Sequence, residues 1–328
     1  MRFFVLLILG LGLGGGLRAA TNGVVSPTNA PAPAVKGTND PVEVEFRALM
    51  ASDDEAQEEV ERWIKENDEF AAKGAGTAPA GLNMRIMERF EPVRKGYEDF
   101  IKRHPNHVRA RVAYGSFLGD ISDEEAAQVQ LEKALEMDAK DPVVYNNLAG
   151  IYGHIGPDVK KAFEYYAKAI ELAPSESLYY RNYATTVFLF RTDAKEYFKI
   201  EEQQVFDKAM ELYDKSLKLD PKNFELATWV AQSYYGIAPV RLDAALKSWT
   251  NALSLAENEV EREGVYVHLA RFKLNAGRFD EARAHLNLVT NANFNDLKAR
   301  LTRNLNEKEK ESKGAATAAQ GTGSPKSE

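Results

Sequence analysis

The chain has 328 residues, of which 44% are hydrophobic, and it carries a net charge of −7 with no cysteine. An acidic balance argues against a nucleic-acid-binding surface, which would be basic. The absence of cysteine excludes disulfides, thiolate nucleophiles, cysteine-ligated metals and attachment of lipid to a cysteine. A chain of this length can form one or two globular units, or an elongated array of repeats.

The first twenty residues have the layout of a secretory signal peptide. Arg2 is followed by the apolar run FFVLLILGLGLGGGL and then by the small-residue exit Ala19-Ala20. The run is short and rich in glycine, which favours a cleaved signal over a membrane span. We therefore expect residues 1–20 to be removed and the protein to be exported, to a periplasm or to the exterior, without a stable membrane span. Removal of Arg2 and Arg18 leaves 40 basic and 49 acidic residues, a net charge of −9. Export without disulfides is consistent with a bacterial origin.

Residues 21–40 contain mainly Pro, Ala, Thr and Asn without periodicity, which is typical of a disordered linker. N-terminal helices are predicted over residues 41–82. The first is short, and a second is expected to begin at the capping box formed by Ser52 and Glu55. A longer amphipathic helix is predicted from about residue 82 to residue 103.

The clearest local pattern lies between Pro142 and Pro174. Tyr145, Leu148 and Tyr152 share one helical face, and Ala162 and Tyr166 continue a facing stripe after the Gly156-Pro157 breaker. This spacing predicts a hairpin of two amphipathic helices. A single hairpin of this kind cannot bury its apolar face, so it requires similar neighbours.

The rest of the chain repeats this pattern. A small residue in each second helix is followed four residues later by a large apolar one and seven residues later, in most units, by another small one. These triplets are Ala127/Leu131/Ala134, Ala162/Tyr166/Ala169, Ala209/Tyr213/Ser216, Ala245/Trp249/Ala252 and Ala282/Leu286/Val289. The first helices align as well, on Tyr114-Gly115, Leu148-Ala149, Tyr183-Ala184, Val230-Ala231 and Leu269-Ala270.

This pattern resembles the tetratricopeptide repeat (TPR), whose unit has about 34 residues. The stretch NAGRFDEARAHL, residues 275–286, matches the turn and second-helix core of that family most closely. The resemblance implies an all-α fold: a right-handed α-solenoid of about five to six helix-turn-helix units over residues 83–294. Extra N-terminal helices would precede the array, and a C-terminal capping helix over residues 295–312 would follow it. Residues 313–328 are predicted to be a disordered tail.

The third unit is longer than the others. The spacing from Ala162 to Ala209 adds residues around 188–203, where Asp193 and Glu196 form another capping box. Because Tyr197, Phe198 and Val205 continue an apolar stripe, we expect longer helices here that project as a ridge.

Motifs that carry chemistry are weak. The string Gly10-x-Gly12-x-x-Gly15 lies inside the signal segment, without the strand and helix that a dinucleotide site needs. His104 and His107 flank a proline at a repeat boundary, which favours a loop pair over a metal site. We therefore predict no catalytic residue, no metal site and no cofactor.

The resemblance also implies a concave groove lined by the first helices, which accepts a protein or peptide partner. The positions that would line it are Asn146, Asn147, His154, Arg181, Asn182, Thr185, Gln232, Tyr235 and Arg271. Asn147 and Asn182 match a family position that often holds peptide backbone or a terminal carboxylate. The full carboxylate-clamp pattern fails, since Val112 and Ser116 stand where it needs lysine and asparagine. The asparagines can equally be read as ties between adjacent helices.

The function predicted from the sequence is that of an exported, non-enzymatic scaffold that binds a protein or peptide partner in this groove. One alternative is a structural subunit of an envelope or secretion assembly. Another is a hydrolase whose site lies where residues 41–103 meet the array, which would need convergent carboxylates in a pocket. Neither the partner nor the oligomeric state follows from the sequence.

Overall fold

The computed structural model describes residues 40–71, 79–154 and 158–321, and every regular element in these ranges is helical. The predicted all-α fold class is thus confirmed. The predicted signal peptide and nearly all of the predicted linker lie outside the described residues. The chain divides into two compact units, Met1–Ser216 and Leu217–Glu328, which are described separately below.

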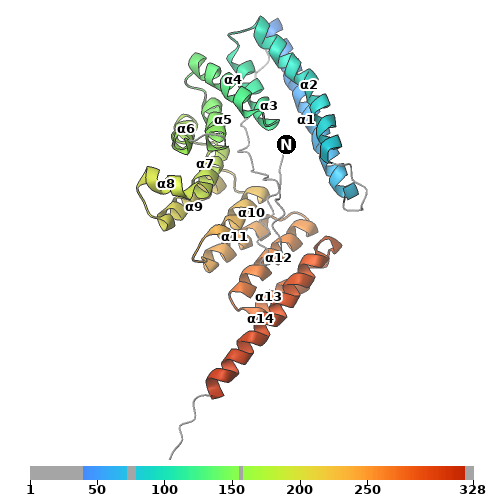
Figure 1. Cartoon of the computed structure of the whole chain (residues 1–328), viewed down its shortest axis with the longest axis vertical. Coiled ribbons are helices and arrows are strands. Elements are labelled where there is room, and N and C mark those ends of the chain that lie inside the picture. Colours follow the sequence, from blue (N-terminus) through green and yellow to red (C-terminus); the bar gives the residue numbers. More distant parts are fainter. Residues whose placement is uncertain (1–39, 72–78, 155–157, 322–328) are drawn as a thin grey trace, which may run out of the picture. The chain divides into compact units, whose positions relative to one another are not determined.

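The first unit begins with a long helical hairpin formed by α1, Pro41–Ala71, and α2, Pro79–Arg103, which run side by side (Figure 1). The predicted break at Ser52 is absent, because α1 continues through the expected capping box. Asp53 from that box is buried and its Oδ2 accepts a 2.7 Å hydrogen bond from Tyr97 Oη of α2. The acidic residue therefore joins two helices instead of starting one.

Two shorter hairpins follow. Helices α3, Val108–Asp120, and α4, Glu124–Met137, form the first. Helices α5, Pro142–His154, and α6, Val159–Leu172, form the second, where the sequence predicts it. The aligned residues Ala127, Leu131, Ala162 and Tyr166 are all buried, which confirms their assignment to packing.

Glycine allows the close approach of α3 to α4. A Cβ added at Gly115 would lie 2.6 Å from Leu131 Cγ, well inside van der Waals contact. The small residue of the first helix and the large residue of the second are therefore complementary, as the repeat pattern predicts.

The enlarged third unit differs from the prediction of longer helices. Helix α7, Ser177–Leu189, is followed by a separate short helix α8, Arg191–Phe198, and then by α9, Glu202–Leu219. The chain turns between α8 and α9 at Lys199, whose φ of 56° is left-handed. Helix α8 packs against α6, where Tyr197 and Phe198 have ring centroids 5.3 and 5.6 Å from that of Phe163. The extra residues thus cover an aromatic side chain of the preceding hairpin.

The second unit contains α10, Phe224–Ser233, the 3₁₀ turn η1, Tyr234–Gly236, and α11, Leu242–Leu255. These are followed by α12, Glu259–Asn275, α13, Phe279–Asn287, and the 3₁₀ turn η2, Ala292–Phe294. The last helix, α14, runs from Asn295 to Gly321 (Figure 1). The C-terminal capping helix was predicted to end at residue 312, so α14 extends into the stretch that was predicted to be a disordered tail. Alanine is abundant there and has the highest helix propensity.

A buried carboxylate fastens the end of α13 to α12. Glu263 Oε2 accepts hydrogen bonds from the backbone N–H groups of Thr290 and Asn291, at 2.8 and 2.7 Å. Glu263 Oε1 accepts a third bond from Thr290 Oγ1 at 2.8 Å. These donors lower the pKa of Glu263, led by the backbone N–H of Asn291. Leu301 and Leu305 of α14 complete the apolar core beside this turn.

Across the described parts of the chain, no helix combines the length and apolar character that crossing a membrane requires.

Candidate functional site

The first helices of the first unit are joined by a chain of side-chain amides. Asn182 Nδ2 of α7 donates to Asn146 Oδ1 of α5 at 3.0 Å. Asn146 Nδ2 donates to Asn147 Oδ1 at 2.8 Å, and Asn147 Nδ2 donates to Ser116 Oγ of α3 at 2.8 Å. These bonds place α3, α5 and α7 next to one another, so that their first-helix positions form one continuous face.

The three asparagines of this chain are almost completely buried. Asn146 and Asn147 are 1% exposed and Asn182 is 2% exposed. A buried amide must be hydrogen-bonded, and here much of its capacity is used between helices. The geometry therefore matches the alternative in which the asparagines tie adjacent helices together. Their role in binding a partner stays a prediction.

The remaining predicted positions of the first unit are more accessible. Arg181 is partly exposed on α7, and Thr185 Oγ1 donates to the backbone carbonyl of Arg181 at 2.9 Å. The hydroxyls of Thr185 and Tyr213 also share a hydrogen bond of 2.9 Å. The side chain of His154 lies outside those that the structure describes.

In the second unit, an aromatic cluster underlies the predicted positions. The His268 ring stacks on the buried Trp249 indole, with centroids 4.1 Å apart and planes 6° apart. A 2.9 Å hydrogen bond joins His268 Nδ1 to Tyr235 Oη, and the Tyr235 ring stacks on Phe272 at 4.4 Å. Burial lowers the pKa of His268 to about 3. The imidazole is therefore neutral at physiological pH.

Arg271 lies over this cluster. Its guanidinium carbon is 5.7 Å from the centroid of Tyr235, within the range of a cation–π interaction. Burial raises the pKa of Tyr235 well above its usual range, although the positive charge of Arg271 acts in the opposite direction. The partly exposed Gln232 comes from the last turn of α10. The second unit thus brings together two predicted positions, Tyr235 and Arg271, on η1 and α12.

The sequence placed Trp249 in the packing pattern, and the structure stacks His268 of α12 on it. No signal in either local sequence indicates their stacking, because they lie in different helices. Only the alignment of the repeats, which puts both residues at regular positions, could have suggested that α11 and α12 meet there.

The two histidines at the repeat boundary face different carboxylates. His107 Nδ1 accepts the backbone N–H of Ala110 at 3.0 Å, which leaves Nε2 to face Glu43 Oε1 at 3.2 Å. His104 Nε2 lies 3.8 Å from Glu45 Oε2. In the described ranges, no group of three or more His, Cys, Asp or Glu side chains could hold a metal ion.

The carboxylates where α1 meets the array are engaged in pairs. Glu43 binds Arg109 at 2.9 Å, and Glu45 binds Arg103. Glu59 binds Arg89 at 2.7 Å. A hydrolase would need two carboxylates that converge on a substrate. The geometry here gives ion pairs between helices instead.

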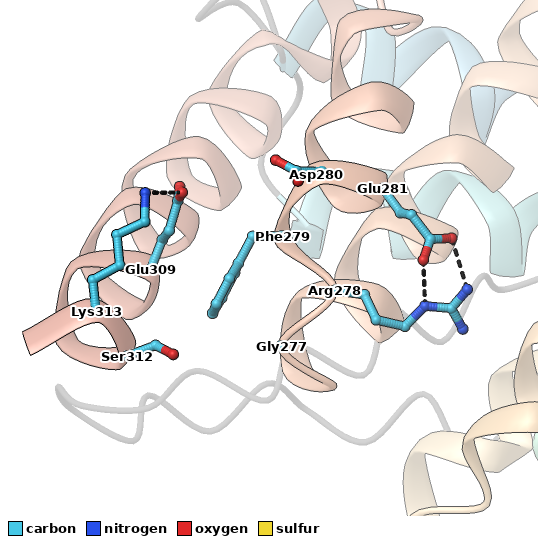
Figure 2. A pocket seen from close by; sticks show the side chains of 8 residues that line it. All are labelled: Gly277, Arg278, Phe279, Asp280, Glu281, Glu309, Ser312 and Lys313. Carbon is cyan, nitrogen blue, oxygen red and sulfur yellow. Dashed lines mark hydrogen bonds and ion pairs between the residues drawn. The ribbon is translucent and has the colours of Figure 1, made fainter. Parts of the chain in front are cut away.

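An open pocket of about 510 Å³ lies in the second unit between the start of α13 and the end of α14. Figure 2 shows the Phe279 ring between these elements, with one ion pair on either side. Arg278 binds Glu281 at 2.6 Å, and Lys313 binds Glu309 at 2.7 Å. These four charged side chains pair with one another, and Asp280 adds a further carboxylate to the lining.

Comparison with known proteins supports the assignment of one hairpin. Residues 143–176 match the family model described as "Tetratricopeptide repeat". This stretch contains almost all of α5 and all of α6. No curated protein matches the chain.

Several solved structures resemble the chain distantly. PilF of Pseudomonas aeruginosa is 16% identical, with a TM-score of 0.46, over 71% of this chain and 90% of its own. YrrB, described as a TPR protein with an unusual peptide-binding site, is 13% identical, with a TM-score of 0.46, over 63% and 97%. A thermophilic TPR protein of Thermus thermophilus, TTC0263, is 21% identical, with a TM-score of 0.41, over 60% and 98%.

Proposed function

We propose that the chain is an exported, non-enzymatic scaffold that binds a protein or peptide partner on the face formed by its first helices. The observation that carries this proposal is the direct joining of α3, α5 and α7 by the amide chain. Consecutive first helices held side by side give a preformed surface. A preformed surface reduces the conformational entropy lost when a partner binds.

The accessible first-helix positions are candidates for recognition. Arg181 and Thr185 in the first unit, and Gln232, Tyr235 and Arg271 in the second, are all partly exposed. Arginine and tyrosine are enriched among residues that dominate binding energy at protein interfaces. The buried asparagines would act mainly by fixing the spacing of the helices that present these residues.

Export is part of the proposal and is supported by the layout of residues 1–20. Expression of the complete chain, followed by N-terminal sequencing of the protein recovered outside the cytoplasm, tests it. A new N-terminus close after Ala19 or Ala20 supports export with cleavage. An intact Met1 in a cytoplasmic fraction contradicts it.

Capture from an extract of the producing cells tests the binding face. The bait is the mature chain, compared with the double variant Arg181→Ala/Arg271→Ala. The matched control is Lys133→Ala/Lys247→Ala, which removes two exposed cations from the second helices α4 and α11. We expect the first double variant to lose proteins that the mature chain and the control both retain. Equal recovery by all three baits would show that the first-helix positions are not the binding surface.

A further inference from the structure

The cationic side chains of α12 and of the turn into α13 differ in their ion-pair and hydrogen-bond partners. Lys273 and Arg278 both bind Glu281, at 3.0 and 2.6 Å. Arg262 donates to the backbone carbonyl of Ala256 at 3.2 Å. Arg271 makes no ion pair with any residue that the structure describes. It lies beside Tyr235, with its guanidinium carbon 5.7 Å from the ring centroid, and it hydrogen-bonds to the Tyr235 side chain. Arg271 is therefore the cation of this described region whose charge is not matched by a carboxylate or a carbonyl.

No carboxylate stands one turn away from Arg271 along α12. One turn on either side along α12 lie Val267, His268, Leu274 and Asn275. On the neighbouring η1, Tyr235 lies beside Arg271. We call the surface formed by Tyr235, His268 and Arg271 the Arg271 face. Its only formal charge is that of Arg271, because burial keeps His268 neutral.

The side chain under Arg271 is held in place by a series of contacts. Tyr235 is fixed by stacking on Phe272 and by its hydrogen bond to His268, and His268 is fixed by stacking on Trp249. Trp249, the innermost residue of this series of contacts, is 1% exposed and therefore belongs to the core. A guanidinium that rests on an immobilised ring loses less rotamer entropy when it binds than a free side chain does.

We infer that the Arg271 face is the anchor point of the partner and that it binds an Asp or Glu side chain within a peptide segment. This inference rests on the proposed function and names the chemistry recognised in the second unit. The planar guanidinium of Arg271 can donate two parallel hydrogen bonds to one carboxylate. The Tyr235 ring supplies an apolar contact beside it.

Paired peptides test this inference without knowledge of the natural partner. An array of peptides of about 12 residues, all amidated at the C-terminus, is made so that each peptide with a central Glu-Glu has a Gln-Gln counterpart in the same context. The mature chain is applied to the array, and the strongest pairs are measured by fluorescence anisotropy. Since hydrogen bonds to charged groups contribute about 1.5–3 kcal/mol, we expect the Glu peptide to bind at least about tenfold more tightly than its Gln counterpart.

Three variants give the assay its specificity. Arg271→Gln should reduce binding of the Glu peptide to that of the Gln peptide, and Arg271→Lys should give an intermediate value because it keeps the charge but loses the planar fork. Arg303→Gln removes an exposed cation from α14 and should leave binding unchanged. Affinity should also stay constant from about pH 5.5 to 8, because His268, with a pKa of about 3, does not titrate in that range.

Several results would overturn the inference. They are the absence of binding to any peptide, equal binding of Glu and Gln counterparts, and equal losses for Arg271→Gln and Arg303→Gln. A second set of the Gln peptides, made with a free C-terminus, tests for a terminal carboxylate; binding of these peptides through Arg271, without binding of their amidated forms, would identify the terminal carboxylate as the ligand instead. If the double variant loses captured proteins while peptide binding is insensitive to Arg271, the proposed function stands and the anchor point lies elsewhere among the first-helix positions.

Discussion

The amide chain of the first unit can be tested by a single truncation at its centre. Asn146 makes two bonds of the chain, since its Oδ1 accepts from Asn182 and its Nδ2 donates to Asn147 Oδ1. Asn146→Ala removes both bonds at a site that is 1% exposed. It leaves a donor of Asn182 and an acceptor of Asn147 without these partners, in a region that water does not reach.

The size of the effect follows from these two bonds. Each contributes about 0.5–1.5 kcal/mol net, and a buried group left unsatisfied costs about 1–3 kcal/mol. We therefore expect Asn146→Ala to lower the free energy of unfolding by about 3 kcal/mol. At about 2–4 °C per kcal/mol for a unit of this size, the thermal midpoint should fall by roughly 6–12 °C. Circular dichroism at the helical minimum measures this midpoint.

An exposed asparagine provides the control. Asn83→Ala in α2 gives the same gain in helix propensity as Asn146→Ala but removes no buried contact. It should change stability by less than about 0.5 kcal/mol. If both variants melt together, the bonds of Asn146 do not hold the helices together. A double-mutant cycle with Asn182→Ala measures the bond between the two residues directly, because a direct bond gives a coupling energy and independent sites do not.

Two further changes test the packing and the electrostatics of the fold. Gly115→Ala should destabilise the first unit by about 1–3 kcal/mol, because its Cβ would lie 2.6 Å from Leu131 Cγ. Urea titration of the variant measures this loss of stability. An unchanged midpoint would show that α3 and α4 can move apart without a cost in free energy. The second prediction concerns Glu263, whose pKa is lowered in the folded state by its bonds to Thr290 and Asn291. Its carboxylate should stabilise the fold above the ordinary value of 4.5, and that contribution should be lost as the pH falls through the lowered pKa. Glu263→Gln should therefore be less stable than the wild type at neutral pH and should approach the wild-type stability in acid. Thermal melts over a pH series measure this difference. A difference that is the same at all pH values would show that the ionised carboxylate of Glu263 does not stabilise the fold.

The hairpins could be predicted because their signal is local and repeated. Small residues such as Ala162 and large ones such as Tyr166 recur at spacings that only helices bring onto one face. Burial of both residues confirms that reasoning. Even the irregular unit kept the pattern, since Ala209 and Tyr213 are also buried.

The boundaries that the sequence missed depend on interactions that are not local. The stripe that continues from Tyr197 to Phe206 fits one long helix or two short ones equally well. The structure selects two, through a left-handed turn at Lys199 and the packing of α8 on Phe163. Lysine carries no sequence signal for that backbone conformation, which glycine would have indicated. At Ser52, the capping pattern was outweighed by the burial of Asp53 against Tyr97.

The sequence could predict which repeat positions form the candidate site, but not which side chains contact one another there. The repeat alignment places Asn147 and Asn182 at equivalent positions of consecutive first helices. It does not reveal that Asn182 bonds to Asn146 instead, because that pairing depends on how far one hairpin is rotated against the next. The same limit applies to the stacking of His268 on Trp249, which depends on how α11 and α12 meet.

The equivalent repeat position serves different purposes in the two units, and this difference bears on specificity. Asn182 and His268 each stand two residues before the small residue of a first helix, Ala184 and Ala270. In the first unit the amide is consumed by a bond between hairpins, whereas in the second the imidazole supports the tyrosine beside Arg271. A polar group satisfied within the protein gains little from a partner, because binding only exchanges one hydrogen bond for another. A cation without a carboxylate gains a charged hydrogen bond, so discrimination between partners should be concentrated at the second unit.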